Sequence, residues 1–190
     1  MHTYKNKYFL IIESIKDIDL KNIKKRDKFS IIYRNKKNLE NTTDLLNFRR
    51  FCKIKSIKFY VANNTNLAVL LNSDGLYISA YNKSFRSLLL KKQNFNIIGS
   101  AHNLKEISLK TKQGCNIILF SKLFLVSYNK KAKFLGAVKF NNYLKINKNL
   151  IPLGGISINN LNSLNNINCQ GFAMLSEIKK KPAKIFSRLF

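Results

Sequence analysis

The chain has 190 residues, which suffices for one hydrophobic core, and its 45% hydrophobic and 12% aromatic content excludes an intrinsically disordered protein. Its formal net charge is +26, from 35 Lys and Arg residues against 9 Asp and Glu residues. The basic residues are spread along the whole chain with Asn and Ile, as A/T-rich codons produce. No RNP, KH or helix-turn-helix motif accompanies them, so the charge indicates no specific nucleic-acid partner.

Eight short apolar segments rich in Ile, Val, Phe and Tyr predict β-strands along the chain. They lie at residues 8–12, 29–34, 58–62, 75–79, 96–100, 116–120, 150–154 and 171–175. Six further segments carry apolar residues at spacings of three and four, which predicts amphipathic helices. These segments are residues 44–54, 66–72, 85–92, 103–112, 159–167 and 176–190. Asn103 and Glu106 form a capping box, so one of these helices should begin just after Asn103.

Strands that alternate with helices and are apolar on both faces indicate parallel pairing. Eight such units predict a compact α/β fold, a closed (β/α)8 TIM barrel with a parallel sheet, formed by residues 1–190 as a single domain. Residues 121–149 depart from the alternation, because a long polar loop precedes any helix there. Such a loop is either functional or a solvated basic excursion, and the sequence favours neither.

The cysteines and the apolar segments bear on where the protein resides. Cys52, Cys115 and Cys169 are widely spaced and form no CxxC pair, which predicts reduced, mostly buried thiols and argues against a zinc site or a disulfide scaffold. The N-terminal apolar stretch is too short for a signal peptide, and no segment approaches the roughly 18 apolar residues of a membrane span. We therefore expect a cytoplasmic protein with no membrane partner.

The loops after the last two predicted strands carry the signals of a phosphate site. In a TIM barrel the functional residues follow the C-terminal ends of the strands, and phosphate often binds after strands 7 and 8. Gly154 and Gly155 follow the seventh strand, and Leu175 and Ser176 follow the eighth at the start of a helix. A tight turn or an ordinary Ser N-cap would explain either signal alone. Together they predict that backbone amides at these four residues bind phosphate.

Two other loops place polar side chains at the same end of the barrel. Arg34 and Lys36 follow the second strand and could direct two cations into the barrel mouth, although a solvated charge run would look the same. Ser100 and His102 follow the fifth strand. His102 is either a general base or a structural loop residue.

Carboxylates are scarce at this end. Of the nine acids, only Glu13 and Glu177 lie just beyond a strand's C-terminal end, and Asp74 precedes the fourth strand and belongs at the opposite face. A Mg²⁺ ion bound through a diphosphate normally needs one or two protein carboxylates. The sequence supplies few candidates for them.

Five segments, taken in order, resemble the thiamine phosphate synthase/TenI family over roughly residues 28–178. They are IIYRNKK, VANNTNLAVLLNSDGLYIS, IIGSAHNLKEI, IPLGGI and GFAMLSEI. The resemblance implies a TIM barrel that joins a hydroxymethylpyrimidine diphosphate to a thiazole phosphate, forming thiamine phosphate and releasing diphosphate. It also implies Mg²⁺ as the cofactor and phosphorylated pyrimidine and thiazole compounds as the partners.

The resemblance assigns roles to individual residues. Those that match diphosphate-binding positions are Arg34, Lys36, Ser100 and, in the loop after the sixth strand, Lys130 or Asn129. Those that match the thiazole phosphate site are Gly155, Leu175 and Ser176.

The sequence departs from the family pattern on the catalytic side. A family glutamine that contacts the pyrimidine falls on Ile32, and the loop threonine after the sixth strand falls on Val126 or Ser127. The Asn-Asp pair after the third strand falls on Ala62 and Asn63, and the aspartate after the fourth strand falls on Asn82. Both metal carboxylates are thus replaced by amides, at Asn63 and Asn82.

Several functions follow from this pattern. The first is a divergent thiamine phosphate synthase in which basic side chains replace part of the metal charge. The second is a TenI-like tautomerase, which isomerises a thiazole carboxylate phosphate without a metal and would use His102 for proton transfer. The third is a non-catalytic protein that binds a thiamine-related phosphate. The sequence leaves open which of them holds and whether the chain forms a homo-oligomer.

Overall fold

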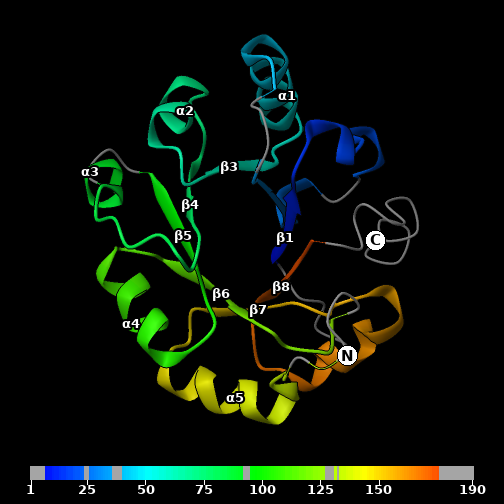
Figure 1. The fold of residues 1–190 in the computed structure, drawn as a ribbon. Helices are drawn as coiled ribbons and strands as arrows, with labels where there is room; N and C mark the ends of the chain where they lie inside the picture. The colour runs from blue at the N-terminus through cyan, green and yellow to red at the C-terminus, as the bar shows by residue number, and fades with distance from the viewer. Residues whose placement is uncertain are drawn as a thin grey trace.

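The computed structural model describes residues 7–23, 26–35, 40–91, 95–126, 131 and 133–175 and forms a closed barrel of eight parallel strands in sequential order (Figure 1). The strands are β1 (Lys7–Ile12), β2 (Phe29–Tyr33), β3 (Lys58–Ala62), β4 (Gly75–Ile78), β5 (Asn96–Ala101), β6 (Ile117–Ser121), β7 (Leu150–Leu153) and β8 (Gly171–Met174). The predicted (β/α)8 barrel is therefore confirmed. Every predicted strand boundary lies within one residue of the observed one, because each apolar run is short and buried on both sides.

The alternation of side chains along each strand produces two apolar layers. One cluster fills the barrel interior and includes Phe9, Ile32, Tyr60 and Tyr77. The other lies between the strands and the helices around them and contains the intervening strand residues. On β4, for example, Tyr77 belongs to the interior cluster, whereas Leu76 and Ile78 belong to the outer one.

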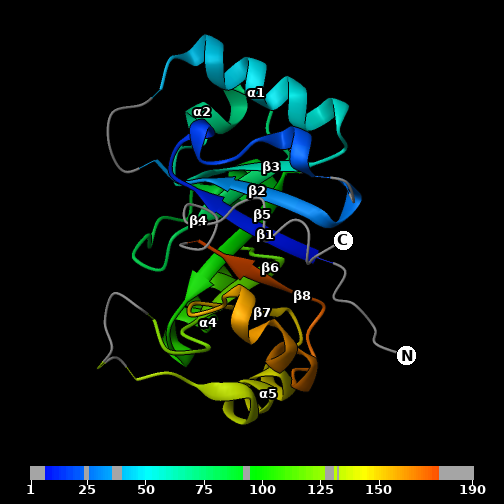
Figure 2. The ribbon, with the colours of Figure 1, turned by 90° about the vertical axis from the view of Figure 1, so that its right-hand side faces the viewer.

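Within the described residues, five α-helices cover the outside of the strands. Figure 1 shows them around the barrel, and Figure 2 shows α1 and α5 on opposite sides of it. They are α1 (Thr42–Ile54), α2 (Thr65–Leu70), α3 (Ser87–Lys91), α4 (Leu104–Lys112) and α5 (Gly136–Ile146). Short 3₁₀ turns cover the remaining connections as η1 (Ile15–Asp17), η2 (Leu20–Asn22), η3 (Arg26–Lys28) and η4 (Ile158–Asn166). α2 and α3 span only six and five residues, so the helical layer is thin beside β4.

The segment predicted as a helix at 159–167 is the 3₁₀ element η4, so the α-helix expected there is wrong. Its Asn and Ser side chains bond to the local backbone instead. Asn160 accepts a hydrogen bond from Ser157 N–H at 2.8 Å and donates one to the Gly155 carbonyl at 2.7 Å. Such bonds compete with a regular helix. The helix predicted at 176–190 lies outside the described residues.

The capping box predicted before α4 is present in altered form. Asn103 is the N-cap, and its Oδ1 accepts from Glu106 N–H at 2.9 Å, as expected. The Glu106 carboxylate, however, accepts from the backbone N–H of His102 at 2.7 Å and from the Asn103 side chain at 2.9 Å. The box therefore also fixes the backbone at His102.

The long segment after β6 is packed against β7 where it begins. Leu123 N–H donates to the Leu153 carbonyl at 2.9 Å, and Phe124 N–H donates to the Gly154 carbonyl at 3.0 Å. Leu123 and Val126 are buried. A fully solvated excursion is therefore excluded for residues 122–126, which form part of the barrel rim.

Three further sequence predictions can be compared with the structure. All three cysteines lie among the described residues and none forms a disulfide; Cys52 and Cys169 are buried, and burial raises the pKa of the Cys52 thiol to about 12. Asp74 lies at the N-terminal end of the strands, where it accepts from Phe59 N–H at 2.7 Å and pairs with Arg49 at 3.3 Å. Within the described part of the chain, no helix has the length and apolar character needed to cross a membrane.

Candidate functional site

A cavity of about 490 Å³ lies at the C-terminal ends of the strands, and we call it the mouth cavity. Six residues singled out in the sequence line it, namely Arg34, Ser100, His102, Gly154, Gly155 and Leu175. The sequence analysis did not single out five polar lining residues, namely Tyr77, Ser79, Tyr81, Ser121 and Lys122. Three other predicted site residues, Lys36, Lys130 and Ser176, lie outside the described residues, as do Glu177, Ser127 and Asn129.

Arg34 carries the main charge of the mouth cavity. Its backbone N–H donates to the Ile12 carbonyl at 2.8 Å, which continues the pairing of β1 with β2 and fixes the residue at the rim. Its guanidinium lies 3.9 Å from the Glu13 carboxylate, at the limit of an ion pair. The Arg34 Nε is buried and has no hydrogen-bond partner among the described residues. A buried donor left unpaired costs about 1–3 kcal/mol, which a ligand acceptor would recover.

Tyr77 and Ser100 form the wall of the cavity next to Arg34. Both side chains are buried, at 1% and 5% exposure. Burial raises the pKa of the Tyr77 phenol, while a hydrogen bond with Ser100 and the positive charge of Arg34 act in the opposite direction. The phenol therefore stays protonated at neutral pH and can donate a hydrogen bond.

His102 and Ser121 form a hydrogen-bonded pair at the rim. The His102 Nδ1 lies 2.7 Å from the Ser121 Oγ, and the ring centroid lies 6.4 Å from that of Tyr81. His102 is exposed, whereas Ser121 is buried. The second ring nitrogen, Nε2, makes no hydrogen bond to any described residue, so the pair leaves one nitrogen available for proton transfer.

Gly154 and Gly155 both have positive φ angles, 91° and 72°. A Cβ on Gly155 would lie 2.5 Å from backbone atoms of Phe124 and Leu125. The requirement for glycine at 155 thus arises from close contact with the loop after β6. The amides of Gly154 and Gly155 donate no hydrogen bond within the described chain and remain available as donors.

The charges around the mouth cavity are positive. Arg34 and Lys122 line it, and no carboxylate does so among the described residues. A cavity with cationic side chains, hydroxyl groups and unpaired amides is suited to an anion with several oxygen atoms.

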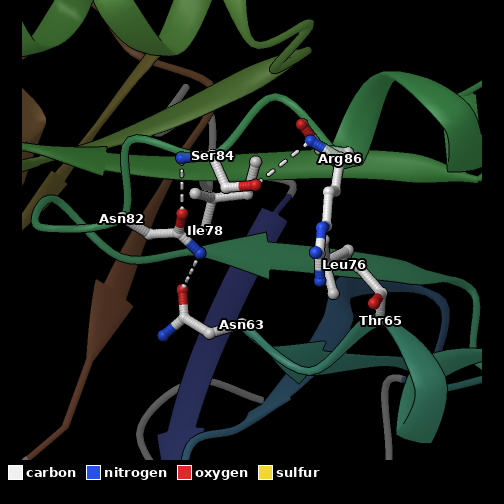
Figure 3. A pocket seen from close by; sticks show the side chains of 8 residues that line it. Asn63, Thr65, Leu76, Ile78, Asn82, Ser84 and Arg86 are labelled. Atoms are coloured by element: carbon white, nitrogen blue, oxygen red, sulfur yellow. Dashed lines mark hydrogen bonds between the residues drawn. The ribbon is translucent and has the colours of Figure 1, made fainter.

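The residues at the family's metal positions are not part of this cavity. Asn63 and Asn82 line a second cavity of about 400 Å³ on the helix side of β4, together with Leu76, Ile78 and Arg86 (Figure 3). We call it the outer cavity. The predicted metal positions thus line a different cavity from the predicted diphosphate and phosphate residues, although Asn63 is hydrogen-bonded to Ser79 at the mouth.

The outer cavity does not suit Mg²⁺. The Asn63 Oδ1 already accepts from Ser79 N–H at 3.0 Å and from the Asn82 side-chain amide at 3.1 Å, and the Asn82 Oδ1 accepts from Ser84 N–H at 2.9 Å. The Lys110 ammonium lies 2.7 Å from the Asn82 carbonyl oxygen. No group of three His, Cys, Asp or Glu side chains that could hold a metal occurs within the described residues. Mg²⁺ prefers carboxylate oxygens, so this donor set does not fit the ion.

The remaining family positions lie at or below the mouth. Ile32 is fully buried in the barrel interior, and Ala62 packs against the same cluster, so neither offers a polar group to a ligand. Val126 lines the mouth cavity and is 5% exposed. The sequence predicted these departures, and the structure shows apolar side chains at all three positions.

Some of the mouth-cavity residues that the sequence analysis did not single out could have been predicted from their position after a strand. Ser121 and Lys122 directly follow the sixth predicted strand, 116–120, and the rule applied to the other loops selects them. Tyr77 lies inside a strand, and its inward direction follows from alternation only once the register of β4 is known. The pairing of Ser121 with His102 had no sequence signal.

The fold and this cavity define a class of protein: a (β/α)8 barrel with a cationic cavity at the C-terminal ends of its strands, lined by no carboxylate of the described residues. Residues 15–178 match the model of the thiamine monophosphate synthase family, TMP-TENI, and the chain belongs to this family.

Individual relatives are distant in sequence. The chain is 27% identical over 131 residues to the thiamine-phosphate synthase of Bacillus cereus and 26% identical over 129 residues to that of Prochlorococcus marinus. Each alignment covers 67% of this chain but only 59% and 37% of the respective relative. The structure of a thiamine phosphate pyrophosphorylase from Pyrococcus furiosus superposes with a TM-score of 0.71 at 17% identity and covers 98% of both chains. That likeness establishes the shared fold.

Proposed function

We propose that the chain acts in thiamine biosynthesis and that its mouth cavity binds phosphorylated pyrimidine and thiazole compounds. The reaction is a thiamine phosphate synthase-like condensation. Family membership and the names of the relatives support this reaction, and the mouth cavity supplies groups suited to its anionic substrates.

The condensation requires charge stabilisation at one bond. The carbon–oxygen bond between the pyrimidine methylene group and the diphosphate breaks, and its electron pair leaves with the diphosphate. The thiazole nitrogen then forms a carbon–nitrogen bond to that methylene carbon, which gives thiamine phosphate. Groups that hold the departing diphosphate more strongly than the bound substrate accelerate the first step.

Arg34 is the residue that carries this proposal. Its Nε is buried at the edge of the mouth cavity and has no hydrogen-bond partner among the described residues, and its guanidinium contacts Tyr77 and lies 3.9 Å from the Glu13 carboxylate. A diphosphate oxygen would satisfy this donor and gain a charge-assisted hydrogen bond. Ser100, with the Gly154 and Gly155 amides, offers further donors to the phosphate oxygens, and Lys122 adds charge.

No step is assigned to a protein-bound Mg²⁺, because the side chains at Asn63 and Asn82 do not fit the ion. In this proposal the positive charge at the leaving group comes from Arg34 and Lys122.

The test is an assay of the purified chain with hydroxymethylpyrimidine diphosphate and thiazole phosphate, with Mg²⁺ or with EDTA. We expect formation of thiamine phosphate under both conditions and a loss of about 100-fold or more in Arg34→Gln. Arg50→Gln, at an exposed position on α1, is the matched control and should retain full activity. Product no higher than in a protein-free blank would overturn the proposal.

A second candidate function has its own supporting observation, the 2.7 Å contact between His102 and Ser121 at the mouth cavity. A TenI-like tautomerase moves a proton within a thiazole carboxylate phosphate, and His102 Nε2 is available to carry that proton. His102→Ala should abolish the isomerisation and change the affinity for the phosphate less than about twofold. Unchanged turnover in this variant would exclude the role of His102. Calorimetry that detects binding without either reaction would instead favour a non-catalytic phosphate-binding protein.

A further inference from the structure

The outer cavity exists because the helical layer is thin at one place. Leu76 and Ile78 point from β4 toward the helices and are themselves buried, at 2% and 1% exposure. α2 and α3 have only six and five residues, and the irregular segment 79–86 connects β4 with α3. A space of about 400 Å³ remains above these two side chains (Figure 3).

The amide of Asn63 has a fixed orientation at the edge of this space. Its Oδ1 accepts from the backbone N–H of Ser79 at 3.0 Å, and a backbone N–H can only donate, so the orientation of the amide is fixed. The same oxygen accepts from the Asn82 side-chain amide at 3.1 Å. The Asn63 Nδ2 makes no hydrogen bond to any described residue. Asn63 thus offers N–H donors and no free acceptor.

The same reasoning applies to Asn82. Its Oδ1 accepts from Ser84 N–H at 2.9 Å, which again fixes the orientation of the amide. Its backbone carbonyl accepts from Lys110 Nζ at 2.7 Å and from Gln113 Nε2 at 3.0 Å. Lys110 is fully buried, so solvent screens the interaction of its charge with the Asn82 carbonyl only weakly.

Arg86 supplies the charge on the open side. Figure 3 shows its side chain extending beside Leu76 and Thr65, at the wall of the cavity. The guanidinium forms no ion pair with a described carboxylate. The hydroxyl groups of Thr65 and Ser84 lie on the same lining, and no Asp or Glu of the described chain lines the cavity. The charged lining residue, Arg86, is a cation, and the hydroxyl groups can donate hydrogen bonds, so the described lining favours an anion.

We propose that the outer cavity is a second ligand site, which binds a phosphate monoester. The phosphate would face Arg86 and the hydroxyl groups of Thr65 and Ser84. Several donors arranged around one cation match the three acceptor oxygens of a phosphate monoester. The site does not rest on the reaction proposed for the mouth cavity, since the two cavities share no lining residue.

The experiment is a titration of ¹⁵N-labelled protein with phenyl phosphate, followed by the side-chain amide signals of Asn63 and Asn82. We expect saturable shifts of both signals, and an affinity lower by about tenfold or more in Arg86→Gln, because a charge-assisted hydrogen bond is lost. Arg34→Gln, which alters the mouth cavity, and Arg50→Gln, which removes an exposed positive charge on α1, should bind within about twofold of the parent protein. Arg86 is exposed, so thermal unfolding should confirm that its variant folds.

Four results would overturn the site. Equal affinity in Arg86→Gln would remove the proposed cation. A loss in Arg50→Gln as large as in Arg86→Gln would show general charge attraction. Equal shifts of the two amide signals on titration with phenol would show that the cavity binds the apolar ring and has no preference for an anion. Saturable shifts with MgCl₂ in place of phenyl phosphate would show a cation site.

Discussion

The mouth cavity and the outer cavity lie on opposite faces of the same strand. Tyr77 points from β4 into the barrel and the mouth cavity, while Leu76 and Ile78 point outward and form the floor of the outer cavity. Both cavities contain an arginine, and no described carboxylate lines either of them. They differ in how that charge is held, because Arg34 has a buried Nε without a partner whereas Arg86 is exposed. The same chemistry is thus expected to bind more strongly in the mouth, where water competes less.

The first way to test this difference is to disrupt the rim of the mouth cavity while leaving β4 intact. Gly155 and Gly136 both have a φ of +72°, but a Cβ at Gly155 would meet the backbone of the β6 loop, whereas a Cβ at Gly136 would meet nothing within 4 Å. Gly155→Ala should lower the free energy of unfolding by about 3 kcal/mol or more, from backbone strain and overpacking together. Gly136→Ala should cost only about 1–2 kcal/mol, from strain alone. Denaturant titration measures both.

The same pair of variants separates the two cavities. Gly155→Ala should abolish pyrophosphate binding at the mouth, while phenyl phosphate still shifts the Asn63 and Asn82 amides of the folded fraction. If Gly155→Ala proves no more destabilising than Gly136→Ala, the contact with Phe124 and Leu125 does not constrain the rim.

A second prediction concerns the two interior tyrosines on neighbouring strands. Tyr77 lines the mouth cavity, whereas Tyr60 lines a cavity at the opposite end of the barrel. Tyr77→Phe should weaken pyrophosphate binding about fivefold, the effect of one hydrogen bond of about 1 kcal/mol. Tyr60→Phe should leave that affinity unchanged, and isothermal titration calorimetry compares them. Equal effects of the two substitutions would indicate that the hydroxyl of Tyr77 does not reach the anion.

The smallest expected effect is on the outer side and depends on pH. Burial lowers the pKa of Lys110 from its ordinary value of 10.5. Between the lowered pKa and 10.5 the unfolded chain binds more protons than the folded chain, so this residue's contribution to stability rises with pH in that window and is least favourable below it. The free energy of unfolding of the parent protein, measured relative to that of Lys110→Met, should therefore increase as the pH approaches 10.5. A flat difference across this window would show that Lys110 titrates as a solvated lysine does.

The barrel and the residues around the mouth cavity could be predicted from the sequence, whereas the outer cavity could not. Strand positions follow from apolar runs, and position after a strand suffices to place Arg34, Ser100 and His102 around one cavity. The outer cavity depends on how short α2 and α3 are, and helix ends depend on packing more than on local pattern. The sequence shows that residues 63 and 82 are asparagines. It does not predict the orientation of their side-chain amides, which is fixed by hydrogen bonds from the backbone N–H groups of Ser79 and Ser84.

The contact between the Lys110 ammonium and the Asn82 backbone carbonyl also matters for any attempt to design a metal site here. Asn82→Asp would introduce a carboxylate into a loop whose backbone already holds a buried cation and whose cavity is lined by Arg86. These positive charges would favour the ionised carboxylate but oppose a divalent cation. A designed metal site at this loop would therefore require the removal of Lys110 and Arg86 in addition to new acids.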